Sequence, residues 1–408
     1  MINYILTEVI TKMSEKTNKI TSNKKLIILF VACFLLAAIF FLWFTFRPGL
    51  LGTFHWHYAI FGAYMGLLAT VLLPLLFFII FLIKSNKVTQ ILLKVFSIFT
   101  FALLFIIFVA LSILPRLPID NSGMNLFTQK DELPVAKNPA KDQPLAHYAF
   151  CSDPHWGAGS SNAEARINIL KNIEKGNYDA CFLLGDIAEV GMITSMYQEA
   201  VDDIKTNMPK TPLLVIPGNH DGIVNGFPAF KKTFFDKGDK LYFRMDNGKI
   251  HLIFMYMIWD DVEFTKKQEK WLRAQLASIP QEETVIVLSH CYVTGSGYYD
   301  SAARRNWGDI PGVVERVPPI FEEYNVDLSL SGHNHFFEML EKDDVDYLIL
   351  GAMGGKLDKD LIYSSPYSKW LNNDDFGWAD LQIYADNILI TIYKEDGSVL
   401  RRRRIKTN

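Results

Sequence analysis

Two histidines, His333 and His335, lie one residue apart directly after Gly332 and an apolar run. The chain of 408 residues has only nine histidines, so this pairing requires an explanation. The imidazole ring is the commonest metal ligand in proteins. The pair could therefore bind metal, lie in a polar turn, or be hydrogen-bonded histidines of the core. The other residues of the chain decide among these three explanations.

Residues of metal-binding types also follow the other apolar runs. They are Asp153, His155, Asp186, Asn219, His220, Asp221 and His290. Singly, each has an ordinary explanation, such as a helix cap for Asp186 or a turn for Asn219. In an open α/β sheet, however, ligands bind beyond the carboxyl ends of the strands. Residues of metal-binding types at the end of nearly every predicted strand therefore favour one shared site.

The apolar runs that precede these residues are short and bounded by polar residues or glycine, as expected for buried strands. They cover residues 147–152, 180–186, 212–219, 251–259, 284–290, 326–333 and 345–351. Helical patterns occupy 163–175, 193–208, 265–278 and 311–324. Alternating segments follow, with an Asp-Gly turn at Gly397. The order predicts an α/β domain over residues 145–408.

Five blocks of this domain resemble, in order, the motifs of the calcineurin-like metallophosphoesterase superfamily. They are D-x-H at 153–155, G-D-x-x-E at 185–189, G-N-H-D at 218–221, the lone His290 and G-H-x-H at 332–335. The resemblance covers about residues 145–352. It implies a two-sheet αββα sandwich that holds two metal ions.

Carried over position by position, the resemblance implies two sites that share one bridging carboxylate, Asp186. The first metal would be bound by Asp153, His155, Asp186 and His335. The second would be bound by Asp186, Asn219, His290 and His333. Mixed nitrogen and oxygen ligands suit Mn, Fe or Zn better than Ca.

The resemblance also implies a reaction, the hydrolysis of phosphomono- or diesters by a metal-activated hydroxide. His220 would act as general acid for the leaving oxygen, and Asp221 would orient its imidazole. The protein-phosphatase branch has an Asp-Arg pair after its second aspartate block, where this chain reads GDIAEVG. This difference argues against a phosphoprotein substrate. The alternative function is a non-catalytic membrane receptor or interaction module on a degenerate phosphoesterase scaffold, which predicts missing ligands.

Three apolar runs precede the α/β domain, at residues 26–46, 57–83 and 95–115. Each is long enough to cross a bilayer as a helix, which takes about 20 apolar residues. We therefore expect a cytoplasmic tail over 1–25, three transmembrane helices and an α/β domain that follows them. Residues 116–144, rich in Pro, Asn, Asp and Lys, predict a linker.

The distribution of basic residues predicts the orientation of these spans. Five lysines precede the first run and three lie between residues 84 and 94, whereas the loop between the first two runs has only Arg47. The positive-inside rule then places the α/β domain outside the cytoplasm. This location favours lipid or cell-envelope phosphate esters as substrates, although nucleotides remain an alternative.

The composition bears on two questions, whether the chain binds nucleic acid and whether it forms disulfide bonds. The net charge of −3, with 21% charged residues, indicates no nucleic-acid partner. Only three of the four cysteines follow the apolar runs, so no disulfide framework is indicated.

Several further features are open to two interpretations. The segment 292–311 is either a substrate loop or an ordinary surface loop, and it carries Tyr298, Tyr299, Arg304, Arg305 and Trp307. Trp156 has the same two interpretations. The stretch GAMGGKL at 351–357 lacks the spacing of a phosphate-binding P-loop and is expected to form a tight turn near the metals. The four arginines at 401–404 are expected on a solvated last strand.

The opening pair has a simple geometric explanation if its segment is extended. Residues i and i+2 of a strand face the same side, about 6.5–7 Å apart. We therefore expect His333 and His335 to reach one metal each, while Asn334 points away. Gly332 would let the backbone approach the site closely.

Overall fold

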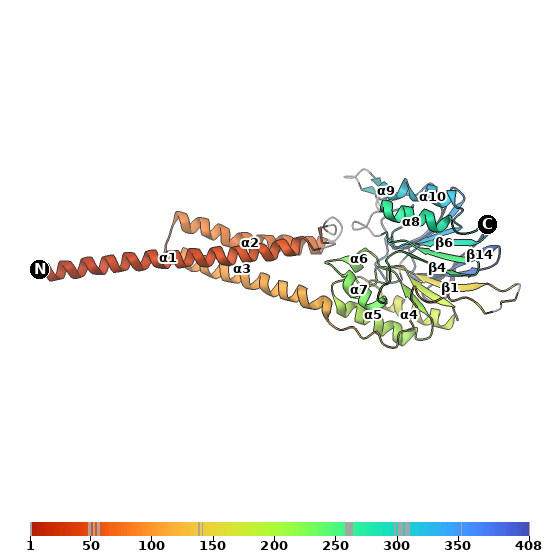
Figure 1. The fold of residues 1–408 in the computed structure, drawn as a ribbon, viewed down its shortest axis with the longest axis horizontal. Helices are drawn as coiled ribbons and strands as arrows, with labels where there is room; N and C mark the ends of the chain where they lie inside the picture. Colours follow the sequence, from red (N-terminus) through yellow and green to blue (C-terminus); the bar gives the residue numbers. More distant parts are fainter. Residues whose placement is uncertain are drawn as a thin grey trace. The chain divides into compact units, whose positions relative to one another are not determined.

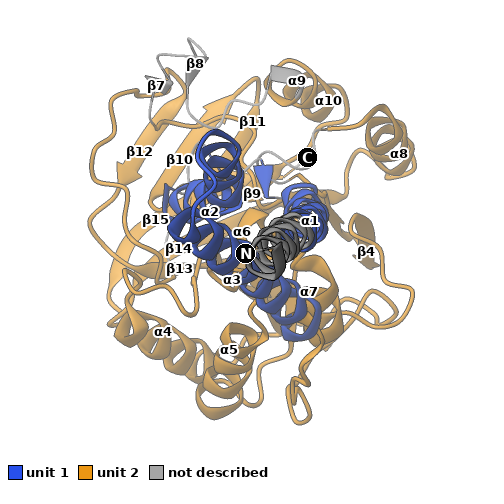
Figure 2. Cartoon of the chain, turned by 90° about the vertical axis from the view of Figure 1, so that its left-hand side faces the viewer, with its two compact units in different colours: residues 1–114 blue, residues 115–408 orange. Residues whose placement is uncertain are grey.

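The structure is a computed structural model. It describes residues 2–407 except 48–49, 52–53, 55–57, 138, 141, 258–263, 298, 301–304, 307–310 and 352. Side chains are also left undescribed at 2–23, 299–300, 305–306 and 311–312. The aromatic and arginine side chains predicted for a substrate loop within 292–311 therefore lie outside the described residues. The chain divides into two compact units, Met1–Leu114 and Pro115–Asn408 (Figure 2).

The first unit consists of three long helices, α1 (Ile2–Thr45), α2 (Tyr58–Ile83) and α3 (Lys87–Ile113). Three helical stretches, Lys24–Thr45, Tyr58–Ile83 and Lys87–Arg116, are long and apolar enough to cross a membrane. The third includes the short 3-10 helix Leu114–Arg116 that follows α3. The third helix begins earlier than the predicted run at residue 95. Asn86 caps its first turn, because its side chain accepts a hydrogen bond from Thr89 N at 2.9 Å.

A polar contact joins α2 to α3 within this apolar unit. Pro74 lies inside α2 and has no N–H, so the carbonyl of Thr70 loses its helical partner. The hydroxyl of Thr100 in α3 donates a hydrogen bond to that carbonyl at 3.0 Å. A buried carbonyl without a hydrogen-bond partner is destabilising, so this bond compensates for the proline.

Replacing Thr100 by valine should therefore weaken the packing of α2 on α3. We expect a loss of about 1 kcal/mol, in the range known for hydrogen bonds between membrane helices. Thermal unfolding of the purified protein in detergent measures the loss. Thr70→Val is the matched control, because the Thr70 hydroxyl donates within its own helix to Gly66 O at 2.8 Å. Equal melting temperatures for the two variants would contradict the prediction.

The second unit is built on two large β-sheets. The six-stranded sheet has the order β15-β14-β13-β1-β2-β3, and the seven-stranded sheet has the order β12-β10-β11-β9-β6-β5-β4. The first contains β1 (Ala146–Cys151), β2 (Ala180–Leu183), β3 (Leu213–Val215), β13 (Gly377–Ile383), β14 (Asn387–Lys394) and β15 (Val399–Lys406). The second contains β4 (Phe243–Asn247), β5 (Ile250–Phe254), β6 (Thr284–Leu288), β9 (Leu328–Ser331), β10 (Phe337–Lys342), β11 (Val345–Leu350) and β12 (Ser368–Asn372). A short hairpin joins β7 (Tyr299–Asp300) to β8 (Arg305–Asn306).

Helices cover the outer faces of the two sheets (Figure 1). The six-stranded sheet carries α4 (Ala163–Lys175), α5 (Thr194–Asn207) and α7 (Phe227–Phe234), and their apolar residues share one core cluster with its strands. The seven-stranded sheet carries α8 (Lys266–Leu276), α9 (Pro311–Val314) and α10 (Val317–Glu323). A second core cluster, which includes Phe150, Phe254 and Leu330, fills the space between the sheets. The prediction of a two-sheet α/β sandwich preceded by three apolar helices is confirmed.

Residues 116–144, predicted as a linker, belong to the second unit and pack against its sheets. Phe127 and Leu133 are buried in the core between the sheets. The backbone also joins the domain, because Phe127 N donates to Leu213 O and Leu213 N donates to Asn125 O. The segment is polar on average, which predicted a linker, but the burial of these two apolar residues holds it against the sheets.

Candidate metal centre

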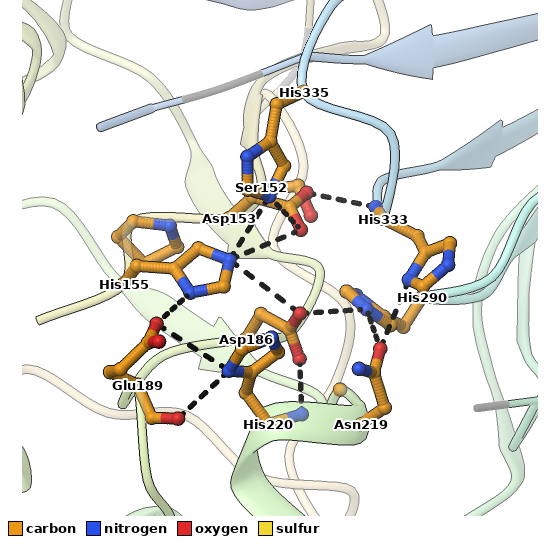
Figure 3. A network of polar contacts seen from close by, with 12 residues as sticks. Ser152, Asp153, His155, Asp186, Glu189, Asn219, His220, His290, His333 and His335 are labelled. Carbon is orange, nitrogen blue, oxygen red and sulfur yellow. Dashed lines mark hydrogen bonds and ion pairs between the residues drawn. The ribbon is translucent and has the colours of Figure 1, made fainter. Parts of the chain in front are cut away.

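The predicted site residues meet where the ends of five strands converge. In one sheet, β1 and β2 run parallel to each other, as do β2 and β3. In the other, β6 and β9 run parallel. The loops after these strands bring together Asp153, His155, Asp186, Asn219, His220, His290, His333 and His335 (Figure 3).

Several of these residues have an unusual backbone conformation. Their φ angles are positive at Asp153 (57°), His155 (48°), Asp186 (53°) and His333 (70°). Residues other than glycine rarely adopt this left-handed region, and such strained positions cluster at functional sites. Tertiary contacts therefore hold four of the seven predicted metal ligands in strained turns.

One half of the site is formed by Asp153, His155 and His335. The Nε2 atoms of the two histidines face each other at 3.1 Å. Asp153 Oδ1 lies 3.9 Å from His155 Nε2 and 3.5 Å from His335 Nε2. The other ring nitrogens are already used: His155 Nδ1 bonds Glu189 at 2.8 Å, and His335 Nδ1 bonds the carbonyl of Lys356 at 2.7 Å. A carbonyl partner requires a proton on Nδ1 of His335, which leaves Nε2 for a cation.

The other half is formed by Asn219, His290 and His333. Asn219 Oδ1 lies 2.9 Å from His290 Nε2 and 3.0 Å from His333 Nδ1. His290 Nδ1 donates to the carbonyl of Leu184 at 2.8 Å. As in the first half, this backbone carbonyl orients the ring and leaves Nε2 directed into the site.

Asp186 lies between the two halves. Its Oδ2 is 3.6 Å from His155 Nε2 and 3.3 Å from His290 Nε2. Its Oδ1 accepts a hydrogen bond from His220 N at 2.8 Å. Gly218 allows this close approach, because a Cβ there would lie 2.2 Å from Asp186 Oδ1. One carboxylate oxygen thus faces ligands of both halves, as a bridging ligand must.

The arrangement fits two divalent cations. Asp153 Oδ1 is buried and accepts no hydrogen bond from the described residues. Two imidazole nitrogens that face each other at 3.1 Å are compatible when a cation replaces the protons. Two compact ligand clusters, Asp153–His155–His335 and Asp186–His290–His333, satisfy the distances expected around a metal ion.

The comparisons with known proteins agree with this geometry. Residues 146–337 match the family model described as calcineurin-like phosphoesterase. The chain carries a calcineurin-like phosphoesterase domain. Acid phosphatase type 7 of Danio rerio is 24% identical over 208 residues, which cover 45% of this chain and 46% of that protein. The 3',5'-cyclic adenosine monophosphate phosphodiesterase CpdA of Escherichia coli (strain K12) is 25% identical over 221 residues, with coverage of 52% and 73%.

A solved structure shows the same fold. Purple acid phosphatase PPD1 from yellow lupin (Lupinus luteus) aligns with a TM-score of 0.56 at 16% identity, covering 66% of this chain and 55% of that chain. The chain spans about half the length of the acid phosphatase type 7 relatives, with 46% and 49% of the zebrafish and human proteins covered.

Within this phosphoesterase domain, His220 is oriented by Glu189 rather than by Asp221. His220 Nδ1 bonds the carbonyl of Glu189 at 2.8 Å and lies 3.5 Å from its carboxylate. The Asp221 carboxylate instead accepts hydrogen bonds from the backbone N–H groups of residues 187, 188 and 218 and from the Tyr197 hydroxyl. The predicted role of Asp221 is therefore corrected: it fixes the loops that carry Asp186 and His220.

Glu189 is the functional residue that the sequence reasoning left without a role. Its carboxylate bonds His155 Nδ1, while its backbone carbonyl bonds His220 Nδ1. It therefore orients a predicted ligand and the predicted general acid together. The signal was present, since Glu189 closes the G-D-x-x-E block.

The prediction that His333 and His335 lie in an extended segment is wrong. They lie in a turn between β9 and β10, and His333 has a φ of 70°. Asn334 does point away from the ligands, because its Nδ2 donates to Ser296 O at 3.0 Å. Gly332 is needed for close approach, since a Cβ there would lie 1.8 Å from Ser152 Oγ.

The structure also places three other features that the sequence analysis singled out: Trp156, the glycine turn after β11 and the four arginines at 401–404. Trp156 is buried, and its Nε1 donates to Asp203 at 2.7 Å, so it supports the fold and does not face substrate. The glycine turn after β11 lies against the site, because a Cβ at Gly355 would be 2.7 Å from the His335 ring and 2.8 Å from the His155 ring. The four arginines occupy the edge strand β15, as expected.

Protonation of the histidines would oppose metal binding in this candidate centre. Burial acts to lower the pKa of His290, but the carboxylates of Asp186 and Asp153 and the hydrogen bond to the Leu184 carbonyl together raise that pKa to about 9. Burial and the neighbouring His290 charge lower the pKa of His333 to about 3. At neutral pH, His290 therefore holds a proton that a cation must displace, and His333 does not.

Metal affinity should consequently rise with pH. For one displaced proton we expect affinity to increase about tenfold per pH unit as pH rises from 6 toward 9. Calorimetric titration of the chelator-stripped protein, in buffers of different ionisation enthalpy, counts the protons released. A titration at pH 7 that released no protons would contradict this expectation.

Proposed function

We propose that the chain is a membrane-anchored two-metal phosphoesterase that hydrolyses phosphomono- or diesters. The observation that carries the proposal is the position of Asp186 Oδ2, 3.6 Å from His155 Nε2 and 3.3 Å from His290 Nε2. A carboxylate placed between two ligand clusters suits a pair of metals. A non-catalytic receptor on this scaffold would have no need of both complete clusters.

Two divalent ions, Mn, Fe or Zn, would supply Lewis acidity toward the phosphoryl oxygens and a nucleophile near neutral pH. Asp153, His155 and His335 would hold one, Asn219, His290 and His333 the other, with Asp186 shared. The proposal covers all three metals, because mixed nitrogen and oxygen ligands can bind Mn, Fe or Zn.

His220 would supply the proton for the leaving oxygen. Its Nδ1 donates to the Glu189 carbonyl, which fixes the ring, and Nε2 would be the atom that transfers the proton. The ring lies beside the first cluster, 4.5 Å between centroids from His155. This position adjoins the ligands without using His220 as one of them.

Both ester classes occur among the relatives, which include acid phosphatases and a cyclic AMP phosphodiesterase. The three apolar helices support anchoring, and the basic residues that flank them favour an extracytoplasmic catalytic domain. Together these support a lipid or cell-envelope phosphate ester as substrate. An engineered cysteine at Lys130 that resisted impermeant thiol reagents in intact cells would contradict the orientation.

Metal analysis combined with two assays tests the proposed activity. The full-length protein, reconstituted with Mn, Fe or Zn, should bind two equivalents of metal and hydrolyse p-nitrophenyl phosphate or bis-p-nitrophenyl phosphate. The relative rates distinguish monoesterase from diesterase activity. Two bound metals without turnover on either compound, or on a panel of phospholipids, would favour the receptor alternative.

A further inference from the structure

Glu338 is a buried carboxylate to which the proposed reaction assigns no role. It lies in β10, three residues after His335, and its exposed fraction is 0%. Its Oε2 accepts a hydrogen bond from Ser296 N at 2.8 Å, and its Oε1 accepts one from Ser296 Oγ at 2.5 Å. Ser368 is a further side-chain hydrogen-bond partner of this carboxylate. Burying a carboxylate is costly unless its oxygens are bonded, so the two bonds to Ser296 are a specific feature.

Ser296 connects three segments of the domain. It lies six residues after His290, and its carbonyl accepts a hydrogen bond from Asn334 Nδ2 at 3.0 Å. Its hydroxyl also accepts a bond from Ser365 N at 2.8 Å. Ser296 and Asn334 are each only 2% exposed, so these bonds are shielded from water.

These contacts join the two loops that form the second half of the site. His290 begins the loop that leads to Ser296, and Asn334 follows His333 directly. The two imidazoles meet at Asn219 Oδ1, with distances of 2.9 and 3.0 Å. Their separation therefore depends on how the two loops are held relative to each other.

We propose that Glu338 is a positioning residue that fixes these two loops in register through Ser296 and Asn334, so that His290 and His333 bind one metal. The inference rests on the two-metal site proposed above. Glu338 is not one of the predicted metal ligands, and it would act through the backbone N–H and hydroxyl of Ser296.

The first half of the site is held by different contacts, so the effect of Glu338 should be selective. His335 N donates to Asp358 at 2.8 Å and His335 Nδ1 donates to the Lys356 carbonyl at 2.7 Å. His155 is held by Glu189. Loss of the Glu338 contacts should thus weaken one metal and spare the other.

Glu338→Leu in the full-length protein tests the inference. Leucine fills similar space but accepts no hydrogen bond from Ser296. Equilibrium dialysis with Mn or Zn, followed by elemental analysis, should show one of the two metals bound about 10- to 100-fold more weakly, the loss typical of outer hydrogen-bonding partners. Glu338→Gln, which keeps one acceptor, should restore most of the affinity.

Glu341→Leu is the matched control, because Glu341 lies in the same strand but pairs with Arg403 at its exposed end. It should bind both metals as the wild type does. If Glu338→Leu does not fold, Asn334→Ala removes the link on the other side of Ser296 and should weaken the same metal.

The outcomes separate the two proposals. A wild-type protein that binds fewer than two metals overturns the two-metal function itself. A wild-type protein that binds two, together with a Glu338→Leu or Asn334→Ala variant that binds both equally well, overturns the role of Glu338. In that case a lowered melting temperature alone would show that the contact serves only stability.

Discussion

Replacing Asp186 by asparagine is expected to remove tight binding of both metals and to lower kcat by about 10³-fold or more. The amide keeps the size of the side chain but loses the charge that faces His155 and His290 at 3.6 and 3.3 Å. Metal ions contribute several kcal/mol of transition-state stabilisation, and each 1.36 kcal/mol corresponds to about tenfold in rate.

Asp153→Asn is the matched comparison for this effect. Asp153 faces only the His155 and His335 side of the site through Oδ1, and its Oδ2 accepts the His333 N–H at 2.9 Å. We expect this variant to weaken mainly the metal held by His155 and His335. Elemental analysis counts the metals in each variant, and circular dichroism shows whether each is folded. Equal metal loss in the two variants would contradict the bridging role of Asp186.

Replacing His220 by alanine should lower kcat about 10²- to 10⁴-fold on substrates with poor leaving groups, the range for general acid catalysis. The effect on p-nitrophenyl esters should be much smaller, because nitrophenolate leaves with little need of a proton. Metal content should stay at the wild-type value. A variant that lost a metal would instead make His220 a ligand, since it also lies in a compact group with His155 and Glu189.

The pH profile offers a second test of His220. Burial lowers its pKa, although the Asp186 and Glu189 carboxylates oppose this shift. A general acid must be protonated, so its contribution is present at low pH and lost as pH rises through the lowered pKa. Wild-type kcat on a poor leaving group should therefore fall on the alkaline side at a pH below 6.5, the ordinary histidine value. His220→Ala should lack that fall.

The sequence by itself determined the residue types of the site and the elements that carry them. Apolar runs of four to eight residues are local signals of buried strands, and β1, β6 and β11 lie within or beside the predicted segments. The helix predicted over 163–175 is α4 with the same ends, because Asn162 caps it. Ligands at strand ends follow from those local patterns and from the parallel order of the strands.

The strand β10 was not found from the sequence. The segment Phe337–Lys342 contains two acidic residues and a lysine, yet it forms β10 between β11 and β12. Its strand conformation comes from pairing on both edges, which joins residues distant in the chain. Long-range contacts also explain why residues 116–144 are packed instead of forming a free linker. Phe127 and Leu133 are buried in a core that is formed by residues from other segments.

Only the tertiary structure decided which partner orients which side chain. Asp221 is next to His220 in sequence, but its carboxylate is occupied by four donors, two from the loop after β2, one from α5 and one from its own turn. Glu189 holds the imidazole instead. His333 adopts a left-handed turn because Asp153 Oδ2 accepts its N–H from across the site. Residue types are local properties and can be read along the chain. Hydrogen-bond partners depend on distances between segments, and folding alone sets those distances.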